Sequence, residues 1–384
     1  MRRFARILCP VLLLGLLSPR AGAAELALAG KSAVLMDAAT GTVIYESNSH
    51  EALAPASVTK VMTMLLIMEA IDSGKIGWED SVTASEAAAA KGGSQIYLKV
   101  GETMSVTDML KSIAVSSAND CACAMAEHIA GSEGAFVERM NSRAAELGMV
   151  DTHFVNCTGL DDGPDAASHR TSAYDIALMS RELIKNHPDI KKFTTIWMDT
   201  VRGGAFGLSN TNKLIRFYSG ATGLKTGYTS GAGYCLSATA LRDGMELIAV
   251  VMGAPSGAER NAACKSLLDY GFANYALIDP SLGDTPWVPV KLGSLPSVDA
   301  RLGQEGSLLI DKGKKSGVTT EIRMEPYLDA PVQEGQRVGT LTLKAGEETL
   351  RELPLVAARQ VDRLTYGQIF TRVLRKAAMA KDPV

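Results

Sequence analysis

The sequence predicts an α+β domain, with one antiparallel sheet covered by helices, followed by a small all-β domain and a C-terminal amphipathic helix. Strand-like hairpins lie near both ends of the first domain, and the long stretch between them is mostly helical in pattern. The composition changes near residue 280, where short strand-like runs separated by Gly and Asp begin. A chain of 384 residues is long enough for two such domains.

The first residues have the pattern of a secretory signal. Residues 1–6 carry three arginines, residues 7–17 are apolar but too few to span a bilayer, and the small residues at 21–24 suit cleavage. We therefore expect a signal peptide over residues 1–24 and a mature protein that acts outside the cytoplasm.

Charge and cysteine usage narrow the set of partners. A net charge of −3 gives no basic field for nucleic acid, so we expect no nucleic-acid partner. Cys9 leaves with the signal, so five cysteines remain and at least one must be unpaired. Cys121 and Cys123 would point away from each other on a helix, and the histidines are scattered. We therefore expect core thiols, no metal site and no cofactor.

The first domain is expected over residues 25–280. The runs 31–37 and 41–46 should pair as a hairpin, and residues 61–68 are apolar on nearly every side, which indicates a buried helix. Further helical patterns and a second hairpin follow, the helices at residues 106–114, 120–130 and 172–185 and the strands at 233–240 and 246–252.

The all-β domain is expected over residues 281–362, with strand-like runs at 307–310, 320–324 and 340–344. Residues 363–384 form a helical segment whose apolar stripe and cations suit the surface of anionic lipid. Docking of the stripe on the β domain is the alternative. The apolar residues are Ile369, Phe370, Val373, Leu374, Ala377 and Ala378, and the cations are Arg372, Arg375, Lys376 and Lys381.

Ser57 and Lys60 stand at the head of the buried apolar run. Pro55 precedes them, which indicates the first turn of a helix, and residues three apart share one helix face. A serine hydroxyl becomes a good nucleophile only when a neighbouring base takes its proton, and a buried lysine can be that base because burial favours its neutral form.

Two further motifs follow in the chain. Ser117 and Asn119 form a Ser-x-Asn element, and Lys225, Thr226 and Gly227 form a Lys-Thr-Gly element just before a predicted strand. Each motif is weak alone, but Ser-x-x-Lys, Ser-x-Asn and Lys-Thr-Gly in this order are the signature of penicilloyl-serine transferases.

The residue types suit acyl transfer. Ser57 would attack, Lys60 would take its proton, and Ser117 would relay a proton toward the leaving amine, while the Asn119 amide would bond both Lys60 and the substrate backbone. Lys225 would add positive potential that disfavours protonation of Lys60. The absence of a side chain at residue 227 would let the substrate backbone lie close to its strand.

The sequence resembles the low-molecular-mass penicillin-binding proteins that are serine-type D-alanyl-D-alanine carboxypeptidases. The resemblance also includes the segments at residues 93–98, 156–160, 223–229 and 253–255. It implies a β-lactamase/transpeptidase-like first domain and removal of the terminal D-Ala from peptidoglycan stem pentapeptides through an acyl-enzyme on Ser57, which limits cross-linking. β-Lactams would acylate the same serine. Separately, the stripe and cations of the C-terminal helix predict that it holds the enzyme on the outer face of the cytoplasmic membrane.

The resemblance also implies the substrate-binding groups. The backbone N–H groups of Ser57 and Tyr228 would form the oxyanion hole, and Lys225, Thr226 and Arg260 would hold the substrate carboxylate. Many relatives have His in place of Tyr228. The run that begins at His169 also departs from the family's pattern, so we assign it no catalytic part.

Two other functions compete with this interpretation. A secreted β-lactamase shares the three motifs, but it would need a second base, usually in a Glu-x-x-Leu-Asn loop, and the sequence has no such loop. In a penicillin-binding sensor or wall-associated scaffold, Ser57 would be acylated but turnover would be negligible. This function requires no residue that the sequence lacks, so it stays open.

Overall fold

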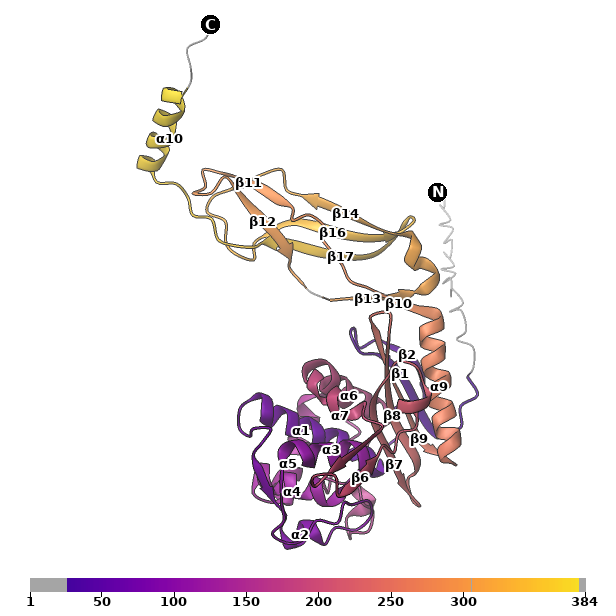
Figure 1. The fold of residues 1–384 in the computed structure, drawn as a ribbon. Helices are drawn as coiled ribbons and strands as arrows, with labels where there is room; N and C mark the ends of the chain where they lie inside the picture. The colour runs from indigo at the N-terminus through magenta and orange to yellow at the C-terminus, as the bar shows by residue number, and fades with distance from the viewer. Residues whose placement is uncertain (1–25, 305, 380–384) are drawn as a thin grey trace, which may run out of the picture.

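The computed structural model describes residues 26–304 and 306–379, and the predicted signal peptide lies outside them. Figure 1 shows an N-terminal domain of helices and sheet, an elongated all-β domain beyond it, and a separate C-terminal helix. The predicted fold class is confirmed.

The central sheet of the N-terminal domain has five antiparallel strands in the order β2-β1-β9-β8-β7. Both predicted hairpins form, and Leu35 of β1 lies opposite Ala249 of β9, so the two ends of the domain meet in one sheet. β7 is an edge strand with one side free of strand partners. The strands are β1 (Ser32–Asp37), β2 (Val43–Ser47), β7 (Ala221–Thr229), β8 (Gly233–Arg242) and β9 (Met245–Ala254).

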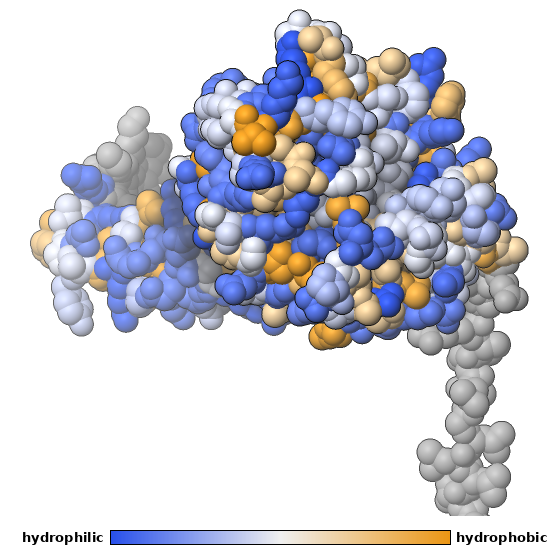
Figure 2. All heavy atoms as spheres, turned by 90° about the horizontal axis from the view of Figure 1, so that it is seen from below, coloured by the Kyte–Doolittle hydropathy of each residue, from blue (hydrophilic) through white to orange (hydrophobic). Residues whose placement is uncertain are grey.

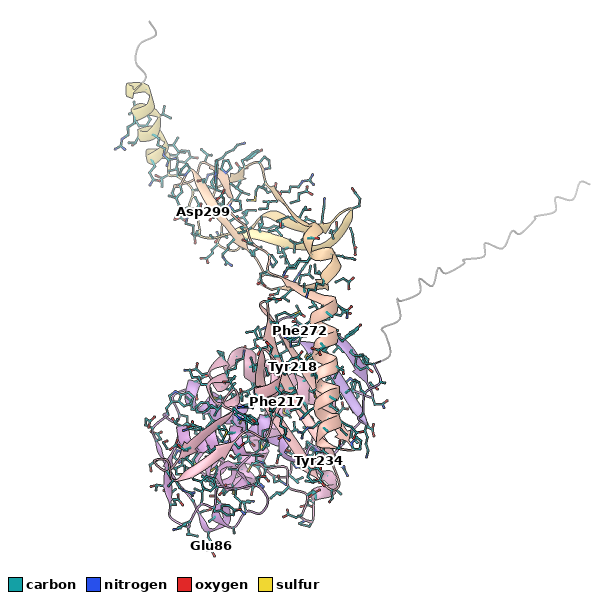
Figure 3. All side chains as sticks on the ribbon, turned by 45° about the vertical axis from the view of Figure 1, so that its right-hand side comes forward. Glu86, Phe217, Tyr218, Tyr234, Phe272 and Asp299 are labelled. Carbon is teal, nitrogen blue, oxygen red and sulfur yellow. The ribbon has the colours of Figure 1, made fainter. Side chains whose placement is uncertain are left out.

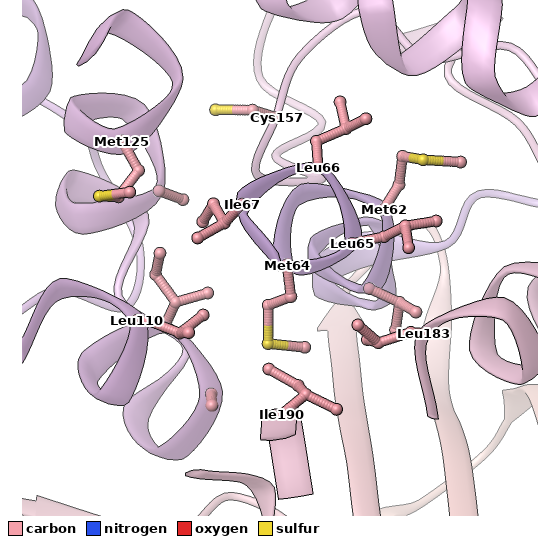
Figure 4. Packing of buried hydrophobic residues seen from close by; sticks show 14 of the residues in the cluster. Met62, Met64, Leu65, Leu66, Ile67, Leu110, Met125, Cys157, Leu183 and Ile190 are labelled. Atoms are coloured by element: carbon pink, nitrogen blue, oxygen red, sulfur yellow. The ribbon is translucent and has the colours of Figure 1, made fainter. Parts of the chain in front are cut away.

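A layer of helices covers one face of this sheet (Figure 1). The predicted buried helix is α1 (Lys60–Asp72), and nearly all its residues are buried. Figure 4 looks along α1 and shows its side chains packing in several directions, toward Leu110 and Met125 on one side and Leu183 on the other. The surrounding helices are α3 (Val106–Ser116), α4 (Asn119–Ala130), α5 (Glu133–Glu146) and α6 (Ala173–Asn186).

Helix α9 (Gly257–Asn274) covers the opposite face of the sheet, where Leu247, Leu267 and Leu268 belong to a second core. Arg242 lies over the rings of Tyr218 and Phe272, both labelled in Figure 3, at 4.3 and 4.7 Å. Short elements complete the domain: η1 (Ala56–Thr59), η2 (Ala166–Ser168), η3 (Pro188–Ile190), α2 (Glu86–Ala89), α7 (Lys191–Thr194), α8 (Leu214–Phe217), β3 (Ser81–Thr83), β4 (Thr103–Ser105), β5 (Met198–Val201) and β6 (Phe206–Ser209).

Figure 2 shows the end of the N-terminal domain away from the second domain. Hydrophilic and neutral residues cover most of this face, and apolar residues form small separate patches. The five cysteines that remain after the predicted cleavage are unpaired and buried. Cys121 and Cys123 are core-filling thiols, as the sequence predicts.

The second domain is a six-stranded sheet in the order β14-β16-β17-β12-β11-β15, with its own core. A two-stranded ribbon connects the domains, because β13 from the second domain pairs with β10 that follows α9 (Figure 1). The elements are β10 (Tyr275–Ile278), β11 (Trp287–Lys291), β12 (Ser297–Leu302), β13 (Leu308–Asp311), η4 (Lys312–Gly317), β14 (Val318–Met324), β15 (Leu328–Asp329), β16 (Arg337–Ala345) and β17 (Glu348–Ala357).

The last described element is α10 (Tyr366–Met379), which confirms the predicted helical segment. Tyr366, Phe370, Val373 and Leu374 are exposed, and Arg372 donates to the carbonyls of Gly293 and Ser294. Among the described residues, the helices are too short or too polar to cross a membrane.

Candidate active site

Ser57 lies in the 3₁₀ turn η1, immediately before α1 begins at Lys60. The sequence predicted the first turn of a helix, and this turn has 3₁₀ geometry where the rest of the helix has α geometry. The difference arises at Ala56, whose φ of +48° is left-handed and interrupts the helical path one residue before Ser57. The serine remains three residues from Lys60, so the predicted pair still forms.

The Lys60 amine is fully buried and donates to Ser57 Oγ at 3.0 Å and to the Thr158 carbonyl oxygen at 2.8 Å. Burial lowers the pKa of Lys60 to about 7, and the negative charge of Asp120 opposes this shift in part. A substantial fraction of this lysine is therefore neutral near pH 7, as a base for the Ser57 hydroxyl requires.

Ser117 follows α3 in the left-handed conformation, at a φ of +62°, and its buried hydroxyl has no partner within the described chain. The Asn119 N–H donates to the Ser94 carbonyl at 2.7 Å, and Asn119 Nδ2 donates to the Gly92 carbonyl at 2.8 Å. The predicted bond between Asn119 and Lys60 is absent, because the Lys60 amine donates to Ser57 and Thr158 while the accepting atom of the amide, Asn119 Oδ1, is left without a partner among the described residues.

Asn119 Oδ1 is also buried without a partner in the part of the chain that the structure describes. An unsatisfied buried polar atom costs about 1–3 kcal/mol, so two such atoms in neighbouring residues favour a ligand that completes their hydrogen bonds.

Asp120 fixes the segment next to this element. Its carboxylate accepts hydrogen bonds from the backbone N–H groups of Ile96, Leu98 and Cys121, at 3.1, 3.0 and 2.9 Å. The sequence analysis gave Asp120 no role. Its position next to Asn119 and the resemblance of residues 93–98 to the family were the only signals available.

Lys225 lies on the edge strand β7 and is also buried, with its amine donating to the Thr226 carbonyl at 2.8 Å. Burial, together with the charges of Lys60 and Arg260, holds the pKa of Lys225 well below its usual range. The Thr226 hydroxyl donates to Thr211 Oγ1 at 2.6 Å, which adds Thr211 as a neighbour that sequence reasoning missed.

Gly227 touches the Ser57 turn directly. A Cβ at this position would lie 2.6 Å from the Pro55 carbonyl oxygen and 3.1 Å from the Ser57 nitrogen. The protein's own backbone therefore fills the space that a side chain would need here, and the approach of the substrate backbone to this strand stays a prediction.

Tyr228 is 56% exposed and stacks on Tyr234, with ring centroids 4.2 Å apart. Tyr234 lies near the N-terminal end of α9 (Figure 3), and the Arg260 guanidinium lies 5.9 Å from the centre of its ring. Arg260 is largely buried, with two of its nitrogens bonded to Asn261 and a third 3.5 Å from the Cys235 carbonyl.

A cavity of about 300 Å³ adjoins Thr158, with Lys91, Gly92, Asn156 and Leu160 among its lining residues. Two of its lining residues are hydrogen-bonded to the site, since Gly92 accepts from Asn119 and Thr158 accepts from Lys60, but Ser57, Lys60, Ser117 and Asn119 do not line it themselves.

One group of possible metal ligands occurs among the described residues, formed by Glu69, Glu182 and His187. Arg143 donates to both glutamates, at 2.7 and 2.6 Å, and so supplies the positive charge that a metal ion would bring. This group is explained as an ion-pair cluster.

The buried Lys60 amine against the Ser57 hydroxyl, with a second buried lysine on the adjacent strand, defines a serine hydrolase site. The family model described as D-alanyl-D-alanine carboxypeptidase matches residues 20–256, and the one described as penicillin-binding protein 5, C-terminal domain, matches residues 283–363. The chain therefore belongs to the D-alanyl-D-alanine carboxypeptidase family and is a serine-type enzyme of that family.

Individual relatives agree with this assignment. D-alanyl-D-alanine carboxypeptidase DacF of Bacillus subtilis is 46% identical over 91% of this chain and 90% of its own length. DacA of Escherichia coli is 32% identical over 90% of this chain and 86% of its own. The crystal structure of penicillin-binding protein 5 from Haemophilus influenzae superposes with a TM-score of 0.76 at 31% identity, covering 89% of this chain and all of that one.

The pKa of Lys60 predicts how the rate of acylation depends on pH. Only the neutral amine can accept the Ser57 proton, so the second-order rate of acylation by benzylpenicillin should fall about tenfold per pH unit below pH 7 and level off above it. Stopped-flow kinetics between pH 5 and 9 measures this profile. A rate that is flat across pH 7 would contradict a lysine base with this pKa.

Lys60→Arg should abolish the profile, because arginine stays protonated, and should lower the acylation rate by about 10²- to 10⁴-fold. Lys75→Arg is the matched control, since Lys75 lies beyond the far end of α1 and donates to the Ile129 carbonyl. Near-normal acylation in the Lys60 variant would place the base elsewhere.

Proposed function

We propose that the enzyme removes the terminal D-alanine from peptidoglycan stem pentapeptides through an acyl-enzyme on Ser57, and thereby limits cross-linking in the cell wall. The observation that carries this proposal is the fully buried Lys60 amine, 3.0 Å from Ser57 Oγ and with a pKa of about 7. Membership of the carboxypeptidase family supports the substrate class.

In the acylation step, Ser57 Oγ attacks the carbonyl carbon of the penultimate D-Ala while its proton passes to Lys60. The peptide C–N bond then breaks as the proton held by Lys60 passes through the Ser117 hydroxyl to the leaving amine, so free D-alanine departs. Water attacks the resulting ester, which restores Ser57 and releases the shortened peptide. The unpartnered Ser117 hydroxyl suits this relay.

The backbone N–H groups of Ser57 and Tyr228 are our candidates for the oxyanion hole. Gly227 packs against the Ser57 turn, so strand β7 and η1 lie side by side. A pair of donors taken from these two segments requires this arrangement. Lys225, Thr226 and Arg260 would hold the substrate carboxylate, and Asn119 Oδ1 would accept from the substrate backbone.

β-Lactams would acylate Ser57 by the same attack, because their strained amide resembles the scissile peptide. Penicillin-binding protein D2 from Listeria monocytogenes, solved in an ampicillin-bound form, superposes with a TM-score of 0.57 at 32% identity and covers 65% of this chain.

Ser57→Ala should abolish both D-alanine release from an acyl-D-Ala-D-Ala peptide and covalent labelling by fluorescent penicillin, because no hydroxyl remains to be acylated. Ser73→Ala, at the other end of α1, should keep both activities. Labelling that survives in a folded Ser57 variant would exclude this serine as the nucleophile. Labelling of the wild-type protein without D-alanine release would favour the sensor or scaffold.

An amide-capped peptide should be a poor substrate if a carboxylate is recognised. Losing one charge-assisted contact is worth about 1.5–3 kcal/mol, which predicts a fall in kcat/KM of about 10- to 100-fold relative to the free acid. Equal rates for the two peptides would identify an endopeptidase.

We also propose that α10 holds the mature enzyme on the outer face of the cytoplasmic membrane. The exposure of Phe370 and Leu374 supports a lipid-facing side, because a helix docked on its own domain would bury them. Arg372 binds the β domain through Gly293 and Ser294, so the attachment of the helix does not depend on its apolar stripe.

Phe370→Ser combined with Leu374→Ser should move the protein from membranes to the soluble fraction while leaving its melting temperature and its activity on soluble peptide unchanged. Ile322→Ser, at an exposed position of the β domain, is the control and should stay membrane-bound. A chain truncated near Leu364 should behave like the double variant. A truncated chain that unfolds, or one that stays on the membrane, would exclude an anchor.

A further inference from the structure

The backbone just before Ser57 is held in a conformation that few residues adopt. Ala56 has a φ of +48°, and such strained positions persist only when their surroundings hold them in place. Gly159 packs against the Ala56 carbonyl so closely that a Cβ on the glycine would lie 1.8 Å from its oxygen. The Thr59 hydroxyl donates to that same oxygen at 2.8 Å.

The other partner of the Thr59 hydroxyl is His169, whose Nε2 lies 2.8 Å away. The Val155 N–H donates to His169 Nδ1 at 3.1 Å, so Nδ1 must be the accepting nitrogen and Nε2 must carry the proton. The hydrogen bonds therefore run in one direction, from the His169 ring to Thr59 and from Thr59 to the Ala56 carbonyl.

This chain of donors requires a neutral imidazole. A protonated ring would carry a hydrogen on Nδ1 as well, and that N–H would face the Val155 N–H. The environment keeps it neutral, because burial, together with the neighbouring His153 and Arg170, lowers the pKa of His169 to about 4. The ring is nearly inaccessible to solvent and packs edge-on against Phe154.

We propose that His169 is a positioning residue for acylation, which acts through Thr59 to hold the Ala56 carbonyl and thereby aims Ser57 at its substrate. The proposal rests on the proposed role of Ser57 as nucleophile. His169 belongs to the run to which the sequence analysis gave no catalytic part, and its hydrogen bonds reach neither Ser57 nor Lys60.

Thr59→Val removes the hydroxyl with little change in shape and should lower the first-order rate of acylation by penicillin about 10- to 100-fold, because small misplacements of a nucleophile have effects of this size. The dissociation constant of the non-covalent complex should change less than threefold. Thr59→Ser keeps the hydroxyl and should restore the rate. Thr194→Val is the matched control, because Thr194 is a buried threonine that donates to the Thr222 carbonyl at 2.7 Å.

His169→Ala should cause the same loss, and the double variant should be no slower than either single one, since both act on one chain of bonds. A normal acylation rate in folded Thr59→Val, or losses that multiply in the double variant, would overturn the proposal. If His169→Ala does not fold, Thr59→Val and Thr59→Ser still decide it. Nitrogen NMR of the wild-type ring must also show the Nε2-protonated neutral form at pH 6, and the opposite tautomer would overturn it.

These outcomes are separate from those for the proposed function. If Ser57 is not the nucleophile, Ser57→Ala keeps its penicillin label. If only the positioning role is wrong, Ser57→Ala loses its label while Thr59→Val acylates normally.

Discussion

The burial of the Lys60 amine beside Ser57 is the interaction on which the rest of the site depends. Removing an ammonium group from water is so unfavourable that the lysine gives up much of its charge near neutral pH, and a base results. Helix α1 can impose this burial because α3, α4 and α6 pack around it. The amine is held by a carbonyl, that of Thr158, and not by a carboxylate, which would keep it protonated.

The turn that carries Ser57, η1, is contacted by segments that are far apart in the chain. Gly159 reaches it from the loop before α6, Gly227 reaches it from strand β7, and both approach so closely that a side chain would collide with the backbone of residues 55–57. Strand β7 can approach in this way because it is the edge of the sheet. The position of Ser57 is therefore set by tertiary contacts as much as by its own helix.

The sequence predicted the parts of the structure that depend on local pattern. The two hairpins, helix α1 and the Ser57–Lys60 contact follow from alternation, apolar periodicity and three-residue spacing. It did not predict contacts between distant segments, such as the hydrogen bond between Lys60 and Thr158, which are 98 residues apart. The missing bond between Asn119 and Lys60 and the unpredicted contact of Gly227 with the Ser57 turn have this same origin, because a motif gives residue types without giving their neighbours.

On the proposed mechanism, the two buried lysines would also couple substrate binding to activation of the base. The charge of Lys60 helps to lower the pKa of Lys225, whereas burial alone accounts for the lowered pKa of Lys60. Because coupling between two sites is reciprocal, a charged Lys225 would in turn disfavour charge on Lys60. The carboxylate of a bound substrate beside Lys225 would stabilise the charged form of that lysine. A charged Lys225 in turn favours the neutral form of Lys60, which is the form that accepts the Ser57 proton. On the proposed mechanism, the anion that identifies the substrate thus also favours the neutral base that activates Ser57 for attack.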